Sequence, residues 1–206
     1  MPNWCNNTIE ISGSEENMKP IYDFLSKYED NEHREDLVMN TLVPHDEEYL
    51  RIQESGDFLL NPQTTFYGTK WDFSLGEAYV HNCSPTFIEL SPSTAWSPPI
   101  EFCSKLAKKY GVSVRITYSE PGCDFAGEAL IDTEGNVDDN EYPYMEGIYI
   151  YGDEEEFWNE IGFRMEMEME EDEPMSVEDF VKDYPFVSNE DREEIIRVYN
   201  ESLIER

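Results

Sequence analysis

Apolar and polar positions change their spacing along the chain, and these changes predict alternating strands and helices. Residues 4–11 (WCNNTIEI) alternate in part, as a strand with one buried face does, and Ser12-Gly13 ends the pattern. After Ser14, a predicted N-cap, apolar residues recur every three or four positions, which is typical of an amphipathic helix. The apolar face of this helix comprises Met18, Ile21, Phe24, Leu25 and Tyr28.

The middle of the chain repeats this alternation. Residues 64–82 predict one or two strands around a turn, and residues 86–90 predict another strand. Residues 97–111 predict a helix with clear ends, because Ser97 is suited to be its N-cap and Gly111 is suited to end it.

The order of these elements predicts the fold class. Residues 112–120 alternate as a strand, residues 124–137 continue as a strand into a turn, and residues 147–152 (GIYIYG) predict a short return strand. Strand, helix, strands, helix and strand describe an α+β ferredoxin-like fold, a split βαβ antiparallel sheet with helices on one face. We therefore predict such a domain over residues 1–151, with a connection or insertion at 31–65.

Residues 152–206 change in composition and predict an acidic α-helical extension. The stretch RMEMEMEEDEP (164–174) alternates methionine with glutamate, as a strand would, but its flanks favour a helix, and Met and Glu are good helix formers. We expect a helix from about 153 to 172 that packs its methionine face on the domain. Two further helices are predicted after Ser176 and Ser188. The apolar face that recurs every four residues comprises Phe157, Ile161, Met165 and Met169.

Charge decides which partners are expected. The chain has 47 acidic and 14 basic residues, a net charge of −33. Direct nucleic acid binding needs Lys and Arg, and an anionic membrane would repel this chain, so neither partner is expected. A basic protein partner is expected instead, because electrostatic steering would attract it. The acidic surface of the extension comprises Asp153, Glu154, Glu155, Glu156, Glu166, Glu168, Glu170, Glu171, Asp172 and Glu173.

These carboxylates permit two interpretations. Spaced like phosphates, they would occupy the basic groove of a nucleic acid-binding protein, so that the chain acts as a nucleic acid mimic or inhibitor. Otherwise they form a solvated face that keeps the chain soluble.

Metal and cofactor chemistry has little support in the sequence. His81 and Cys83 share one strand face and Cys5 is a further thiol, but a zinc site needs three or four clustered ligands. The four cysteines are widely spaced, which is typical of reduced thiols in a cytoplasmic protein. No apolar run is long enough to span a membrane, and the N-terminus lacks the features of a signal peptide. We expect no cofactor.

Several segments over residues 1–130 resemble the YubB ferredoxin-like family of plasmids, phages and other mobile elements. The resemblance is carried by MPNWCNNTIEISG (1–13), LVMNTLVP (37–44), FYGTKWD (66–72), TAWSPP (94–99) and SEPGCDFAGE (119–128). It implies a ferredoxin-like domain without an iron–sulfur cluster and a bacterial mobile-element setting, but no established reaction. The chain departs from the family pattern at Tyr67, where the family usually has Trp, and in its acidic extension.

The family-type polar and aromatic positions are candidate ligand- or partner-binding residues. They could converge at one edge of the sheet to hold a ligand. They could instead be architectural, by packing the core, satisfying backbone groups and shaping turns. These positions are Trp4, Asn7, Lys70, Trp71, Asp72, Trp96 and Glu120.

Three functions follow as hypotheses. We expect a non-enzymatic interaction protein of a bacterial mobile element that binds a basic protein partner. The alternative is a small-ligand-binding or enzymatic module that uses Asn7, Lys70, Asp72 and Glu120 around Trp71 and Trp96. A third is a structural component of a virion or plasmid particle, which would self-assemble.

Overall fold

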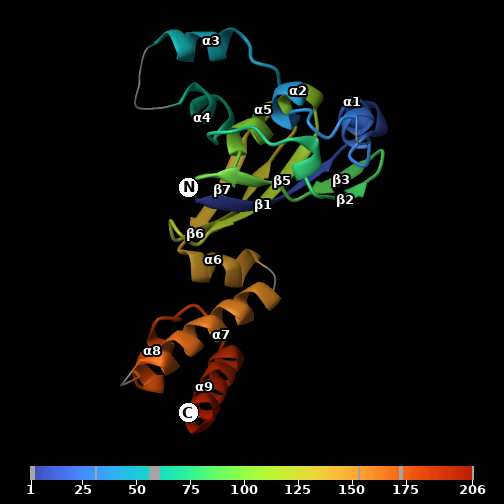
Figure 1. Ribbon diagram of the computed structural model, residues 1–206. Helices are drawn as coiled ribbons and strands as arrows, with labels where there is room; N and C mark the ends of the chain where they lie inside the picture. Colours follow the sequence, from blue (N-terminus) through green and yellow to red (C-terminus); the bar gives the residue numbers. More distant parts are fainter. Residues whose placement is uncertain (1–2, 31, 56–60, 153, 172–173, 206) are drawn as a thin grey trace.

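The computed structural model describes residues 3–30, 32–55, 61–152, 154–171 and 174–205 (Figure 1). A curved antiparallel sheet occupies one end of the molecule, and a group of helices occupies the other. None of the helices in the described ranges is both long and apolar enough to cross a membrane.

The first part of the sheet has the ferredoxin-like order. The elements run β1 (Trp4–Ser12), α1 (Glu15–Leu25), β2 (Val80–Cys83), β3 (Phe87–Leu90), α5 (Ile100–Tyr110) and β5 (Ser113–Glu120). Their strands lie in the order β2-β3-β1-β5, with antiparallel neighbours, which is the arrangement of a split βαβ sandwich. The predicted α+β ferredoxin-like fold is confirmed.

Three further strands complete the sheet. β6 (Phe125–Ile131) and β7 (Val137–Tyr142) extend it beyond β5, and the short β4 (Ser93–Ala95) pairs with β1. The turn between β6 and β7 is held by Asp132, whose Oδ1 accepts the backbone N–H groups of Glu134 and Asn136 at 2.9 and 3.0 Å. The predicted return strand at 147–152 is wrong. The polar segment VDDNEY is the edge strand, where exposed acidic side chains are tolerated and deter further pairing.

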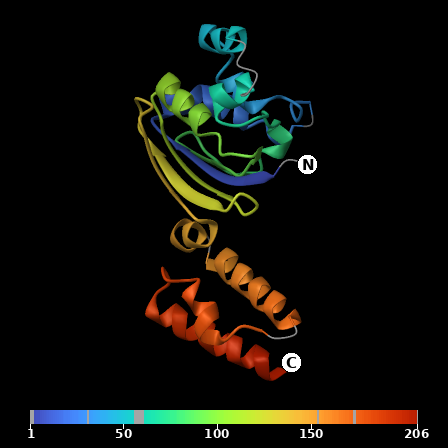
Figure 2. The same ribbon diagram turned by 90° about the vertical axis from the view of Figure 1, so that its left-hand side faces the viewer.

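Helices cover one face of the sheet and enclose the main core. Cross-strand partners share a face, so Ile9 of β1, Ile116 of β5 and Ala129 of β6 line up beneath the helices. α1 follows its predicted cap, since the Ser14 side chain accepts the N–H of Asn17. Figure 2 shows α1 and α5 on this face of the sheet.

The segment between α1 and β2 contains several short helices. It contains α2 (Val38–Leu42), α3 (Glu47–Glu54), α4 (Pro62–Tyr67) and a short 3-10 helix, η1 (Leu75–Glu77). The predicted strands over 64–82 are therefore wrong except for β2. Phe66 and Tyr67 are fully buried in the main core, and the Asn61 side chain caps α4. The helix start outweighs the strand preference of the aromatic and β-branched residues that follow.

The predicted start of α5 is also wrong. Ser97 is not the N-cap, because α5 begins at Ile100 after Pro99. The Ser97 hydroxyl donates instead to the carbonyl of Gly68 at 2.5 Å, and so ties α5 to the loop after α4. The other end is as predicted, with Gly111 in the left-handed conformation (φ 65°).

A helix contacts the opposite face of the sheet. α6 (Tyr144–Tyr151) packs against β6, on the side away from α1 and α5 (Figure 2). Gly147 permits the close approach, because a Cβ there would lie 2.5 Å from the carbonyl oxygen of Ala126. The apolar residues of GIYIYG thus bury a helix face against the sheet.

The extension has a core of its own. α7 (Glu154–Glu170), α8 (Val177–Lys182) and α9 (Asn189–Glu205) pack together with α6. The predicted methionine helix is confirmed: Phe157, Ile161 and Met165 are buried, and Met169 packs against them. Its apolar face packs against α6, which lies within residues 1–151, and against α9, so it contacts the predicted domain through α6. The predicted caps at Ser176 and Ser188 are confirmed.

The two cores do not divide at residue 152. Ala126 of β6 and Met145 and Ile148 of α6 belong to the same apolar cluster as the extension. The predicted division into 1–151 and 152–206 stays a prediction.

Candidate functional site

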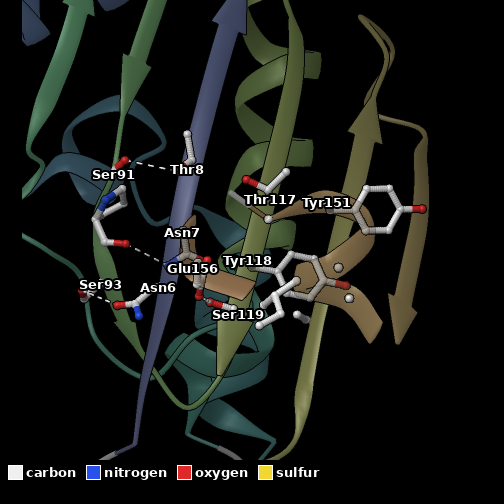
Figure 3. Close-up of a pocket in the computed structure, with 16 residues that line it drawn as sticks. Asn6, Asn7, Thr8, Ser91, Ser93, Thr117, Tyr118, Ser119, Tyr151 and Glu156 are labelled. Carbon is white, nitrogen blue, oxygen red and sulfur yellow. Dashed lines mark hydrogen bonds between the residues drawn. The ribbon is translucent and has the colours of Figure 1, made fainter. Parts of the chain in front are cut away.

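A polar groove lies on the face of the sheet away from α1 and α5. Its floor is built from alternating positions of β1 and β5 and from the segment between β3 and β4 (Figure 3). Asn6 and Ser119 are cross-strand partners on this floor, and Thr8 and Thr117 form the next pair. The volume of the groove is ≈ 360 Å³. Its principal side chains are Asn6, Thr8, Ser91, Ser93, Thr117, Ser119, Ile148, Tyr151 and Glu156.

Hydrogen bonds link the side chains of this floor. The hydroxyls of Thr8 and Ser91 lie 3.2 Å apart, and Ser91 Oγ is also 2.9 Å from His81 Nε2. The Ser93 hydroxyl donates to Asn6 Oδ1 at 3.3 Å. These bonds hold the floor side chains in place but do not use all of their hydrogen-bonding capacity, because each hydroxyl can donate one hydrogen bond and accept two.

α6 and the first turn of α7 supply one wall of the groove. Ile148 and Tyr151 come from α6, and Glu156 comes from the first turn of α7. Glu156 Oε1 accepts the Ser119 hydroxyl at 3.5 Å, which connects the wall to the floor. The groove therefore exists only where α6 crosses the sheet.

The groove has little positive charge near it. Among the described residues that line it, none is Lys or Arg, and Glu156 is the acid. Farther along the same face, Arg115 lies between Glu10 and Glu128, at 2.8 and 2.6 Å from their carboxylates. Its charge is thereby offset by two acids.

A second, aromatic groove is formed by the N-terminal strand and the loop before β2. Trp4, Trp71 and Tyr79 line it and are 51%, 43% and 65% exposed. The rings of Trp4 and Trp71 are 6.1 Å apart between centroids, and the Lys70 Nζ lies 5.1 Å from the centre of the Trp71 ring. Asp72 and Glu77 also line this groove, which has a volume of ≈ 570 Å³.

The predicted site residues have divided roles. Asn7 is buried, and its Nδ2 donates to the Cys5 and Pro92 carbonyls and to Thr94 Oγ1 at 2.9, 3.0 and 2.9 Å. It thus fastens β1 to the β3–β4 segment. Burial raises the pKa of the neighbouring Cys5 thiol to about 12, so this thiol is protonated at neutral pH.

Asp72 combines two roles. Its carboxylate accepts the N–H groups of Met39 and Asn40 at the start of α2, at 2.9 and 2.8 Å, and also that of Phe73 at 2.8 Å. Burial nevertheless raises the pKa of Asp72 above its ordinary value. Its oxygens are committed to the backbone, although the residue borders the aromatic groove.

Glu120 and Trp96 lie outside both grooves. Glu120 is 2% exposed, and its Oε1 accepts the N–H of Gly122 at 3.0 Å, which shapes the turn after β5. Its Oε2 has no hydrogen-bond partner among the described residues. Trp96 is 44% exposed and has a positive φ of 73°. Its backbone N–H donates to the backbone carbonyl of Asn3.

The seven candidate residues therefore do not meet in one pocket. The structure brings together Trp4, Lys70, Trp71 and Asp72 and separates them from Asn7, Trp96 and Glu120. No group of three His, Cys, Asp or Glu side chains in the described ranges is placed to hold a metal ion.

The acidic surface predicted on the extension follows α7. Glu154, Glu155, Glu166 and Glu170 are exposed, whereas Glu156 and Glu168 are half-buried. Glu168 Oε2 accepts the N–H of Met175 at 3.2 Å. Glu171 is exposed after the end of the helix. Asp153, Asp172 and Glu173 lie outside the described residues.

Part of this chain matches a known protein family. Residues 66–160 match a family model described as "Ferredoxin-like domain in Api92-like protein". The match covers just under half of the chain. The matched segment contains FYGTKWD, TAWSPP and SEPGCDFAGE, the central motifs of the resemblance, and most residues of the polar groove. It is not a match to a YubB model, so membership of that family stays a prediction.

One solved structure is similar. The crystal structure of protein api92 from Yersinia pseudotuberculosis has a TM-score of 0.45 and 10% sequence identity, over 69% of this chain and 98% of that chain. No curated protein matches the chain.

Sequence reasoning missed both the polar groove and Tyr79. The floor residues Thr8, Thr117 and Ser119 are the outward positions of alternating strands, so their common face was predictable, but the helix that makes the face a groove was predicted as a strand. Tyr79 has a positive φ of 46° in the loop before β2, which no local pattern indicates.

Proposed function

We propose that this chain is a non-enzymatic interaction protein that binds a basic protein partner through its aromatic groove. The observation that carries the proposal is the shared exposure of Trp4, Trp71 and Tyr79 along one groove. Trp and Tyr are enriched among the residues that contribute most binding energy at protein interfaces. A protein partner would cover this apolar area and leave the rim polar.

Charge supports a basic partner. Asp72 and Glu77 border the groove, and the whole chain has a net charge of −33. A cationic protein would be attracted over long range and would then place its own apolar or basic side chains against the tryptophans. The resemblance to YubB-type proteins extends the proposal to a bacterial mobile-element setting.

The orientation of the α7 carboxylates makes nucleic acid mimicry less favourable. Successive residues of an α-helix are rotated by about 100°, so the acids of α7 spread around its axis. A mimic needs rows of charge spaced like phosphates. We therefore place the contact at the aromatic groove, with the acids of α7 contributing to attraction.

The rival hypothesis of an enzyme or small-ligand module has less geometric support. It requires Asn7, Lys70, Asp72 and Glu120 to converge around Trp71 and Trp96. Asn7 and Asp72 are engaged with the backbone, and Glu120 is buried in a turn. The binding function requires no such convergence.

Affinity capture from a bacterial lysate with matched variants tests the proposal. The wild type, Trp71→Ala and Phe163→Ala are compared at about 0.05 and 0.5 M NaCl, with quantitative mass spectrometry. Phe163 is the control, since it is 57% exposed on α7 and lies outside the groove. We expect a basic protein whose capture is lost with Trp71→Ala, by about 30-fold in affinity, and weakened by salt, but retained with Phe163→Ala.

Capture that is insensitive to Trp71→Ala contradicts the proposal. Tight direct binding of the purified chain to DNA would also contradict it.

A further inference from the structure

We propose that the polar groove is a binding site for a neutral saccharide unit. The floor presents hydroxyl groups and one carboxamide in two adjacent rows across neighbouring strands, as Figure 3 shows. One row contains Ser93, Asn6 and Ser119, and the next contains Ser91, Thr8 and Thr117. All three side chains of the second row carry a hydroxyl group.

The hydrogen-bonding chemistry of the floor selects the class of ligand. Each hydroxyl both donates and accepts, and the Asn6 amide offers one group of each kind. A ligand whose groups also donate and accept can bond to such a surface at many points. Sugar hydroxyls have this property, whereas a phosphate or a carboxylate only accepts and an ammonium only donates.

The charges around the groove disfavour an anion. No described lining residue is cationic, and Glu156 stands at the wall with its Oε1 3.5 Å from the Ser119 hydroxyl. Arg115, on the same face, is already bonded to Glu10 and Glu128. An anionic ligand would lose hydration without gaining an ion pair.

The size and the walls of the groove also suit one sugar ring. Its volume of ≈ 360 Å³ is within the range of small-ligand sites, about 300–1,000 Å³. Tyr151 of α6 is half-buried at the wall and provides apolar surface for the C–H groups of a ring. The remaining floor pairs, Thr8 with Ser91 and Asn6 with Ser93, hold the polar groups in place before a ligand arrives.

Ligand-observed NMR of the full chain tests this site. The probes are glucose, galactose, N-acetylglucosamine and ribose, each beside its phosphorylated form, at roughly 10 mM. We expect saturation transfer to at least one neutral sugar, with a Kd of about 1 mM, and weaker transfer to its phosphate. Amide shifts in the labelled wild-type chain should be largest for Asn6, Thr117, Ser119 and Gly147.

Matched variants separate a built site from general surface contact. Thr117→Val and Ser119→Ala each remove one floor hydroxyl, and Ser113→Ala is the control, an exposed serine on the same strand outside the groove. Each floor variant should weaken binding about fivefold, and the control should leave it unchanged. Absence of transfer to every neutral sugar overturns the proposal. So do amide shifts confined to other surfaces, or equal binding of the phosphorylated forms.

The polar groove and the aromatic groove share Asn6 and Ser93 as lining residues, so the two proposals are separated by variants at residues that line only one of the grooves. Trp71→Ala, which removes the aromatic contact, should leave sugar binding unchanged, and Ser119→Ala should leave partner capture unchanged. Failure of one proposal is thereby distinguishable from failure of the other.

Discussion

Asn7 shows how a single polar side chain holds two distant parts of the sheet together. It lies between the exposed Asn6 and the half-buried Thr8, yet it is 4% exposed on the helix-covered face. Its Nδ2 reaches the Pro92 carbonyl and Thr94 Oγ1, more than eighty positions later in the chain. The side chains of its neighbours, Asn6 and Thr8, face the polar groove. Because side chains alternate along a strand, Asn7 stabilises the fold while the residues on either side of it form surface.

Replacement of Asn7 by Ala should destabilise the chain by about 2–3 kcal/mol, because two buried carbonyl groups and the Thr94 hydroxyl lose a donor. The adjacent Asn6→Ala, on the exposed face, should change stability by less than about 0.5 kcal/mol. Urea denaturation of the two variants measures both values. Equal effects would show that Asn7 is not the fastening point.

At the scale of elements, α7 decides between the two periods of the methionine and glutamate stretch. In a strand, Met165, Met167 and Met169 would share one face, but in the helix Met165 is 3% exposed and Met167 is 51% exposed. Packing does not require glycine at position 162, since a Cβ there would meet no described atom within 4 Å apart from its chain neighbours and the nearby backbone of its own helix. The four-residue recurrence of apolar residues therefore outweighs the local alternation.

Met165→Ala should cost about 2–3 kcal/mol, because it opens a cavity between α7 and its neighbouring helices. Met167→Ala, two positions away in the same motif, should cost less than about 0.5 kcal/mol. Thermal and urea unfolding, followed by circular dichroism, compare the two. A similar loss in both variants would be inconsistent with the helix.

At the scale of the whole molecule, negative charge is the dominant feature. The net charge of −33 is distributed over exposed side chains of both the sheet region and the extension. Like charges repel in the compact state and less so in the expanded unfolded chain, which lowers stability at low ionic strength. The C-terminal part of α7 adds to this, since it carries acids where a helix dipole favours bases.

Salt should therefore stabilise the chain. We expect the Tm to rise by about 5 °C between roughly 0.01 and 0.3 M NaCl, with most of the gain as the Debye length falls below about 10 Å. The double variant Glu166→Gln and Glu170→Gln should have a higher Tm at low salt and a smaller response. Differential scanning calorimetry provides the measurement. A Tm that is constant or falls over this range contradicts the role of self-repulsion.

Elements whose signals lie within a few residues could be predicted from the sequence. The ferredoxin-like order, the caps at Ser14, Ser176 and Ser188, the end of α5 at Gly111 and the helical period of α7 all follow from local spacing. These features depend on hydrogen bonds and apolar contacts between near neighbours, so a short window of sequence contains their cause.

The face that each element covers and the side chains that meet depend instead on how the layers pack in three dimensions. GIYIYG was equally suited to a strand by its composition, but as α6 it covers the second face of the sheet and turns a row of hydroxyls into a groove. Trp4 and Trp71 meet although 66 residues separate them in the sequence. Asn7, by contrast, lies outside this aromatic contact and donates a hydrogen bond to Thr94. Such contacts depend on how the layers pack, and no spacing along the chain encodes them directly.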